Sequence, residues 1–151
     1  ALVGAQAPAR VVDAYSGVGD TAAAIARAGA SVVAIELDAA ASRVAAARLP
    51  AGSRAVADSV EHALAGALPV DLVLLNPPRG GLASTVTRAL EQANPRAGTI
   101  IYVSCDPATL ARDVGRLPSY RVASVLGFDM FPQTAHVETV CELRLDEGAA
   151  A

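Results

Sequence analysis

The stretch TIIYVSCDPATLARDV (residues 99–114) joins an apolar segment to a helical one through a single cysteine. Residues 99–104 are rich in Ile, Tyr and Val and predict a buried strand. Asp106, followed by a proline, is a good N-cap, and a helix is expected to continue over residues 108–114. Cys105 therefore falls at the positive end of a helix dipole, where a thiolate nucleophile is favoured. Since most cysteines are small buried hydrophobes, Cys105 alone also fits core packing.

The same alternation of strands and helices runs along the whole chain and predicts an α/β fold with a doubly wound parallel sheet. No helix separates the last two strands, which should therefore pair antiparallel. We expect helices on both faces of a mostly parallel, seven-stranded sheet with an antiparallel last strand. The expected strands cover residues 10–15, 31–36, 54–57, 70–75, 99–104, 120–127 and 138–145, and the expected helices cover residues 20–28, 39–49, 59–66, 82–93 and 108–114.

Length and composition bound the class of protein. The 151 residues fit one domain, expected over residues 1–146 with a C-terminal tail at 147–151. No apolar run approaches the roughly 20 residues of a membrane span, and no signal peptide is apparent, so a cytoplasmic setting is expected. Two cysteines far apart predict neither a disulfide framework nor a metal site. A net charge of −3 is unfavourable for a self-sufficient nucleic-acid binder. The start at Ala1, without Met, is interpreted as an excised catalytic domain or a very short version of one.

A glycine-containing loop follows the first expected strand, in DAYSGVGD (residues 13–20). Gly17 and Gly19 permit a tight turn and the close approach of a ligand to backbone amides at a helix start. Glu36, at the end of the second strand, is placed to bind the ribose hydroxyls of a nucleotide cofactor. A purely structural turn is the alternative. A dinucleotide fingerprint is just satisfied by this spacing, whereas Asp13 at the start of the loop fits S-adenosylmethionine enzymes better.

Three further segments carry polar residues to the ends of strands. Asp58 follows the third strand, where it can meet an adenine edge or cap the next helix. NPPRGG (residues 76–81) follows the fourth strand, and its two prolines make a rigid wall at the edge where such sheets bind ligands. Glu138 begins the last strand and should lie at the same sheet edge as Cys105, where it can act as a general base. His136 is interpreted as structural and Cys141 as core packing.

Together these segments resemble the RNA uracil-5-methyltransferase family, which uses S-adenosylmethionine to make 5-methyluridine in tRNA and rRNA. The resemblance rests on DAYSGVGD, NPPRGG, YVSCDPATLARDV and DMFPQTAHVETV, in the order and spacing of the family and spanning residues 13–140. It implies the Rossmann-like fold of class I S-adenosylmethionine-dependent methyltransferases. It also implies cofactor-binding positions and a catalytic pair. The cofactor positions are Tyr15, Asp20, Glu36, Asp58 and Asn76, beside Gly17 and Gly19 of the loop, and the catalytic pair is the nucleophile Cys105 and the base Glu138.

The implied chemistry accounts for these residue types. Uracil C5 is a weak nucleophile, and addition of a thiolate at C6 activates it toward a methyl sulfonium. A base must then remove the C5 proton so that the thiolate can leave, and Glu138 is the natural group. The target uridine, in tRNA or rRNA, has to leave any helical stack to enter the site.

The sequence departs from the family pattern in three ways. Asn76 stands where family members usually carry Asp, and Asp106 stands where they usually carry Asn. Because the two replacements leave the net charge unchanged, we hypothesise that the carboxylate has moved between walls of one pocket and that activity survives. No upstream RNA-binding β-barrel or cysteine cluster for an iron–sulfur centre is present, and Gln6 is a doubtful match to the family's glutamine. RNA capture is therefore expected to require an additional RNA-binding domain.

Other functions are compatible with parts of the pattern. Asn-Pro-Pro at residues 76–78 also occurs in amino-group methyltransferases, although Arg79 replaces their aromatic residue and those enzymes need no cysteine. A non-catalytic module that binds cofactor or RNA is a second alternative, opposed by the presence of both Cys105 and Glu138. A nicotinamide-dependent oxidoreductase is the remotest alternative, and cofactor titration separates it.

Overall fold

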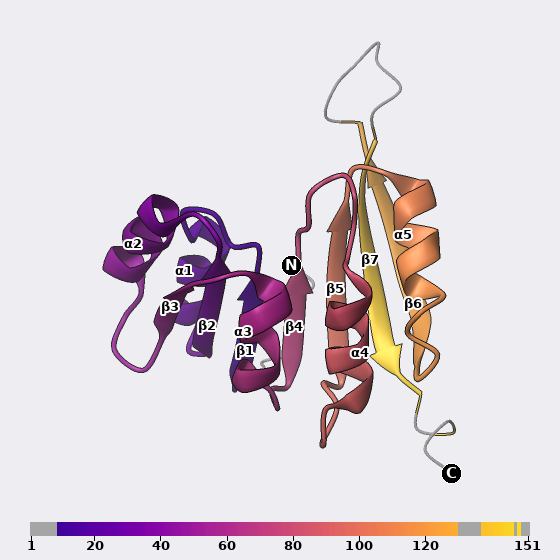
Figure 1. The fold of residues 1–151 in the computed structure, drawn as a ribbon, viewed down its shortest axis with the longest axis horizontal. Helices are drawn as coiled ribbons and strands as arrows, with labels where there is room; N and C mark the ends of the chain where they lie inside the picture. The colour runs from indigo at the N-terminus through magenta and orange to yellow at the C-terminus, as the bar shows by residue number, and fades with distance from the viewer. Residues whose placement is uncertain (1–8, 130–136, 147, 149–151) are drawn as a thin grey trace.

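A computed structural model describes residues 9–129, 137–146 and 148 of the chain, which form one sheet flanked by helices (Figure 1). The strands are β1 (Arg10–Ala14), β2 (Ser31–Glu36), β3 (Arg54–Ala57), β4 (Leu72–Leu75), β5 (Thr99–Ser104), β6 (Tyr120–Phe128) and β7 (Glu138–Leu145). The helices are α1 (Asp20–Arg27), α2 (Ala39–Arg48), α3 (Val60–Ala67), α4 (Ser84–Gln92) and α5 (Pro107–Val114).

The sheet has the strand order β3-β2-β1-β4-β5-β7-β6. Neighbouring strands from β3 to β5 are parallel, and β7 runs antiparallel to both β5 and β6. The expected seven-stranded, mostly parallel sheet with an antiparallel last strand is therefore confirmed. The order of the strands reverses between β1 and β4, and open α/β sheets bind ligands at such a switch point, outside the carboxyl ends of the strands.

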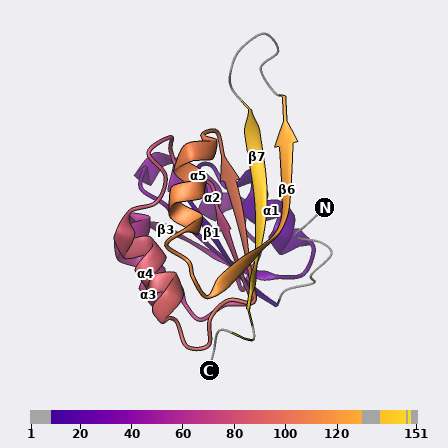
Figure 2. The same cartoon turned by 90° about the vertical axis from the view of Figure 1, so that its right-hand side faces the viewer.

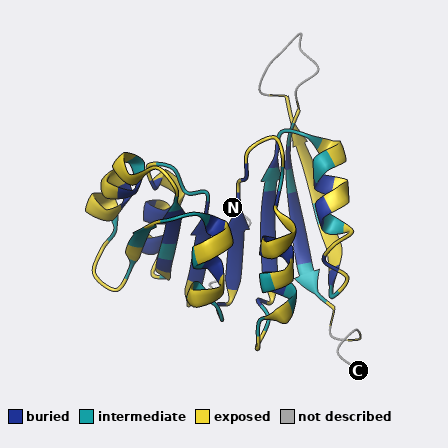
Figure 3. Ribbon diagram, viewed as in Figure 1, coloured by how far each residue is buried: buried dark blue, intermediate teal, exposed yellow. Residues whose placement is uncertain are grey.

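Helices cover both faces of the sheet, as the two views in Figures 1 and 2 show. On one face, α3, α4 and α5 bury residues such as Leu64, Leu90 and Leu110 against the central strands. On the other face, α1 packs Ile25 against β1, β2 and β4. The central strands are consequently buried on both sides (Figure 3), which explains why they read as continuous apolar runs.

Two of the expected boundaries differ from the observed ones where a side chain packs against the core from outside an element. Leu82 is buried but belongs to the loop after β4, so the helix expected over residues 82–93 begins at Ser84. Tyr15 was expected to end the first strand, but its φ of 61° is left-handed and β1 stops at Ala14. The hydrophobic character of these residues therefore predicted that they pack against the core but not which backbone conformation they adopt.

The last strand in the sheet order is the least covered part of the fold. Most residues of β6 are exposed, among them Val125 and Phe128. Within the described residues, no helix is long and apolar enough to cross a membrane.

Candidate functional site

The loop between β1 and α1 adopts a conformation that glycine permits. Gly17 and Gly19 have φ of 55° and 79°, in the left-handed region that disfavours other residues. A Cβ on Gly19 would lie 2.6 Å from the Cβ of Ala45, so α2 packs directly on this turn. Gly19 also occupies the N-cap position of α1 without offering a side-chain acceptor, which leaves amides at the helix start available to a ligand.

Glu36 supports this loop from the end of β2. One carboxylate oxygen accepts a hydrogen bond from Gly17 N at 2.9 Å, and the other accepts one from Asp38 N at 2.8 Å. Since each carboxylate oxygen has two lone pairs, both retain the capacity to accept a further hydroxyl. The carboxylate is thus held in place by the backbone and can still bind a ribose.

A cavity of about 430 Å³ opens at the carboxyl ends of β1, β2 and β4. It includes three of the predicted cofactor positions, which come from three different strand ends. It also includes Glu61, which the sequence analysis did not single out and which carries no motif signal. The cavity is lined by Tyr15, Glu36, Leu37, Ser59, Val60, Glu61, Asn76 and Pro78.

Several buried polar atoms in this region lack partners. Among the described residues, four buried side-chain oxygens make no hydrogen bond, and three belong to Asp13, Tyr15 and Ser16. Burial raises the pKa of Asp13 from 3.8 to about 7, and burial followed by the nearby Glu61 carboxylate raises the pKa of Tyr15. Because an unpaired buried polar group costs roughly 1–3 kcal/mol, this clustering indicates a segment built to receive a polar ligand.

Four of the predicted cofactor residues do not line that cavity: Gly17 and Gly19, which shape the adjoining loop, and the two carboxylates Asp20 and Asp58. Asp20, at the start of α1, is exposed and forms an ion pair with Arg48. Asp58 accepts a hydrogen bond from Ser59 N at 2.7 Å and lies 2.6 Å from Nδ1 of His62. The alternative role of Asp58 as the N-cap of the next helix is wrong, because the N-cap of α3 is Ser59. The Asp58 carboxylate nevertheless contacts residues of the first turn of α3.

Cys105 lies in the two-residue connection between β5 and α5 and is partly exposed. The Asp106 carboxylate accepts hydrogen bonds from Ala108 N and Thr109 N at 2.9 and 3.0 Å, as expected of the N-cap of α5. These backbone hydrogen bonds lower the pKa of Asp106. The predicted position of the cysteine at the start of a helix is therefore confirmed.

Glu138 lies across from Cys105. In the antiparallel pairing of β5 with β7, Val103 is opposite Val140 and Ser104 is opposite Thr139. The next position of this register would place Cys105 opposite Glu138, the first residue of β7. The expectation that both residues share one sheet edge is confirmed, and their chemical roles remain predictions.

The remaining motif residues are placed as follows. Asn76 lines the cavity, whereas Asp106 is not one of the lining residues and caps α5 instead. Since Asn and Asp cap helices equally well, this geometry gives Asp106 a local reason of its own. Cys141 is buried in the core, as expected, and burial raises the pKa of its thiol. His136 and Gln6 lie outside the described residues, as does most of the tail at 147–151.

A buried carboxylate for which the sequence predicted no role lies in α5, the helix that Cys105 precedes. Asp113 in α5 is fully buried and accepts hydrogen bonds from Leu82 N at 2.7 Å and from the Tyr102 hydroxyl at 2.8 Å. Its position three residues after the buried Leu110 places it on the core-facing side of α5. A charged residue on an otherwise apolar helical stripe was the signal that could have identified it.

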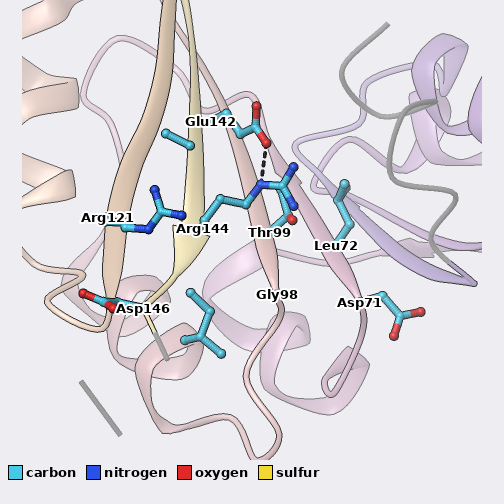
Figure 4. A pocket seen from close by; sticks show the side chains of 10 residues that line it. Asp71, Leu72, Gly98, Thr99, Arg121, Glu142, Arg144 and Asp146 are labelled. Carbon is cyan, nitrogen blue, oxygen red and sulfur yellow. Dashed lines mark hydrogen bonds and ion pairs between the residues drawn. The ribbon is translucent and has the colours of Figure 1, made fainter. Parts of the chain in front are cut away.

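A second, larger hollow of about 850 Å³ lies at the opposite end of the strands (Figure 4). It is lined by residues at the amino ends of β4 and β5 and the carboxyl end of β7, including Thr99, Glu142 and Arg144. Thr99 and Cys105 are six residues apart, about 20 Å along a strand. This hollow is therefore separate from the candidate active site, despite its size.

Comparisons with known proteins agree on one family. The family model "tRNA (Uracil-5-)-methyltransferase" matches residues 58–145. The 23S rRNA (uracil(747)-C(5))-methyltransferase RlmC of Vibrio vulnificus is 36% identical over 138 residues, covering 88% of this chain and 36% of that protein. RlmC of Salmonella paratyphi B is 47% identical over 87 residues, covering 58% of this chain and 23% of that protein.

A solved structure gives the same result. The Pyrococcus abyssi tRNA (uracil-54, C5)-methyltransferase, in complex with S-adenosyl-L-homocysteine, superposes with a TM-score of 0.80 at 31% identity. The match covers 94% of this chain and 37% of that one. The chain thus spans between 23% and 37% of the length of these relatives.

Proposed function

The chain belongs to the tRNA (uracil-5-)-methyltransferase family, and from that premise we propose that it carries the catalytic site of an RNA methyltransferase. Its fold is that of class I S-adenosylmethionine-dependent methyltransferases. The proposed reaction transfers a methyl group from S-adenosylmethionine to C5 of a uridine in tRNA or rRNA. The observation that supports it most directly is the pairing of Ser104 with Thr139, which brings the following Cys105 and the preceding Glu138 to the same end of β5 and β7.

The cavity at the carboxyl ends of β1, β2 and β4 fits the proposed cofactor. The Glu36 carboxylate, held by two backbone amides, would accept the ribose hydroxyls, and Tyr15 and Asn76 would line the bound molecule. The unpartnered oxygens of Asp13, at the end of β1, and of Tyr15 and Ser16, in the loop that follows, support a polar ligand at this segment. When bound there, S-adenosylmethionine supplies an electrophilic methyl group.

Cys105 would act as the nucleophile on the base. Its thiolate forms a bond to C6 of the uracil, and the electron pair of the C5–C6 double bond moves toward O4, so that C5 becomes nucleophilic. C5 would take the methyl group as its bond to the sulfonium breaks, which leaves S-adenosylhomocysteine. Glu138 then takes the C5 proton, the C5–C6 double bond re-forms and the thiolate leaves.

The acidic character of the chain bears on how RNA is captured. Its net charge of −3 gives little electrostatic attraction for phosphates. We therefore propose that RNA binding requires a further RNA-binding domain, and that residues 1–146 supply the chemistry.

Trapping with 5-fluorouridine tests the proposed reaction. The chain, fused to the RNA-binding domain of a relative, is mixed with S-adenosylmethionine and tRNA or rRNA fragments that contain 5-fluorouridine, and its intact mass is measured. Because fluorine at C5 leaves no proton to remove, a working site should remain covalently attached to the RNA. We expect the adduct to form with Cys141→Ser, which alters the buried cysteine, and to disappear with Cys105→Ser. An adduct that survives Cys105→Ser would contradict the assignment of the nucleophile.

A further inference from the structure

The buried carboxylate of Asp113 joins three segments of the proposed site. Its Oδ2 atom accepts hydrogen bonds from Leu82 N at 2.7 Å and from the Tyr102 hydroxyl at 2.8 Å. Leu82 ends the loop whose earlier residues line the cofactor cavity, and Tyr102 belongs to β5, three residues before Cys105. Asp113 itself lies in α5, the helix that Cys105 precedes.

The second oxygen of the same carboxylate strengthens this junction. Oδ1 accepts hydrogen bonds from Nε and a terminal nitrogen of Arg112 at 2.9 and 2.8 Å, and from Arg116 at 3.4 Å. The terminal nitrogen of Arg112 also donates to Gly80 O at 2.8 Å. The backbone of residues 80–82 is therefore held at two groups: the Leu82 amide donates to Asp113, and the Gly80 carbonyl accepts from Arg112.

The turn is shaped to let this contact form. Gly81 has a φ of 73°, and a Cβ at this position would lie 2.4 Å from Asp113 Oδ2 and 2.2 Å from Cγ2 of Thr109. The loop can approach α5 this closely because residue 81 has no side chain. The contact between the loop and α5 thus depends on a glycine at position 81 and on the short carboxylate side chain of Asp113.

From this arrangement we propose that Asp113 is a positioning residue that fixes the cavity wall at residues 76–82 relative to Cys105. The inference rests on the proposed function, since it concerns how the methyl donor and the nucleophile are held in register. A displacement of about 1 Å between reacting groups can lower a rate about 100-fold. Asp113 contacts neither reactant but joins the loop beside the cofactor cavity to the helix after Cys105. Its loss should therefore lower kcat more than it weakens cofactor binding.

Asp113→Asn tests this role because it keeps the shape of the side chain and removes an acceptor. The amide nitrogen would face either the Leu82 amide or the Arg112 guanidinium, both of which are donors. We expect kcat for methyl transfer to RNA to fall about 10- to 100-fold. We expect the dissociation constant for S-adenosylhomocysteine to change less than about threefold, since the Glu36 half of the cavity is untouched. Hydrogen exchange at the Leu82 amide should become at least about tenfold faster.

Two matched controls separate positioning from stability. Glu142→Gln changes another buried acid, which is paired with Arg144 beside the distant hollow in Figure 4, and should leave kcat within about twofold of the unaltered chain. Tyr102→Phe removes one donor to Asp113 and should lower kcat about threefold to tenfold. Its control is Tyr120→Phe, because the Tyr120 hydroxyl is buried without a hydrogen-bond partner in the described part of the chain.

The outcomes discriminate as follows. A fall in kcat for Asp113→Asn that Glu142→Gln does not share, together with faster exchange at Leu82, supports the positioning role. Equal kcat in the two variants, or unchanged exchange at Leu82, overturns it. If Asp113→Asn does not fold, Tyr102→Phe decides: kcat within twofold of Tyr120→Phe overturns the role.

A failure of the proposed function itself would be recognised in the unaltered chain fused to the RNA-binding domain of a relative, as an absence of both methyl transfer and the fluorouridine adduct. The junction is then judged without RNA or cofactor, by Leu82 exchange and by the rate at which iodoacetamide alkylates Cys105. If Tyr102→Phe and Asp113→Asn change neither quantity, the junction does not position the cysteine.

Discussion

On the β1–β2 side of the sheet edge, three buried side-chain oxygens have no partner, whereas on the β5–α5 side the Asp113 carboxylate accepts five hydrogen bonds. The first side also has left-handed backbone at Tyr15, Gly17 and Gly19. The second side has a capped helix directly after Cys105. The two sides are parts of one sheet and differ in how completely their polar groups are satisfied.

This difference matches the work that we propose for each side. A segment that binds and releases a cofactor can leave acceptors open, because the ligand completes them in each cycle. A nucleophile must already be oriented before the reaction begins, since any rearrangement at that moment adds to the barrier. The comparison teaches that an unsatisfied segment and a fully bonded one can mark the binding and reacting halves of a single site.

The largest expected effect concerns the reacting side. Glu138→Gln should reduce release of methylated RNA about 10²- to 10⁴-fold, because the amide cannot take the C5 proton. Cofactor affinity should be unchanged, and a covalent intermediate on ordinary uridine RNA should accumulate in the intact-mass spectrum. Glu142→Gln, in the same strand, serves as the control. Normal turnover by Glu138→Gln would remove the base from the reacting side.

The next effect concerns the incomplete side. Since the pKa of Asp13 rises from 3.8 to about 7 on folding, the folded chain binds more protons than the unfolded chain between these values. Stability should therefore fall as the pH rises through this window, by at most about 4 kcal/mol. Asp13→Asn should abolish this part of the slope and stabilise the chain at pH 8, measured by urea unfolding. Asp71→Asn alters an exposed acid at the other end of the sheet and should retain it.

The sequence predicted mainly those features of the two sides that depend on contacts between residues close together in the chain, and it missed mainly those that depend on distant residues. Periodicity predicted the strands, and the missing helix before residue 138 predicted the antiparallel pairing that brings Glu138 toward Cys105. The pairing of Asp20 with Arg48, 28 residues away, has no local signal and removed Asp20 from the cavity. The contact between Asp58 and His62 follows helical i, i+4 spacing and was predictable in principle. Glu61 entered the cavity through the packing of α3, which no motif encodes.

A smaller effect tests whether the backbone-held carboxylate defines the binding side. Glu36→Gln leaves one of the two amides, Gly17 N or Asp38 N, without an oxygen acceptor and weakens any bond to a ribose hydroxyl. We expect the dissociation constant of S-adenosylhomocysteine to rise about 10- to 100-fold, as for the loss of one charge-assisted hydrogen bond. Calorimetric titration measures it. Asp38→Asn retains an N-cap outside the cavity lining and should bind normally. Equal affinities for the two variants would contradict a ribose contact at Glu36.

The smallest effect is expected where the two sides meet, at Asn76. Asp106 cannot simply replace a carboxylate there, because its Oδ1 accepts the two amides that begin α5 and it does not line the cavity. Compensation between the two positions would then act through the local electric field, to which the Glu36 and Glu61 carboxylates of the cavity already contribute. An added charge on an exposed residue is worth about 1 kcal/mol or less.

Asn76→Asp should accordingly change methyl transfer and cofactor affinity less than about fivefold, in single-turnover assays and calorimetry. The double variant with Asp106→Asn restores the arrangement usual in the family and tests coupling between the two positions. If they act independently, the double variant shows the product of the single effects. A strong gain of methylation from Asn76→Asp alone would show that the cofactor-binding side lacks a carboxylate at residue 76. Residue 76 would then count, with Asp13, Tyr15 and Ser16, among the positions where that side is incomplete.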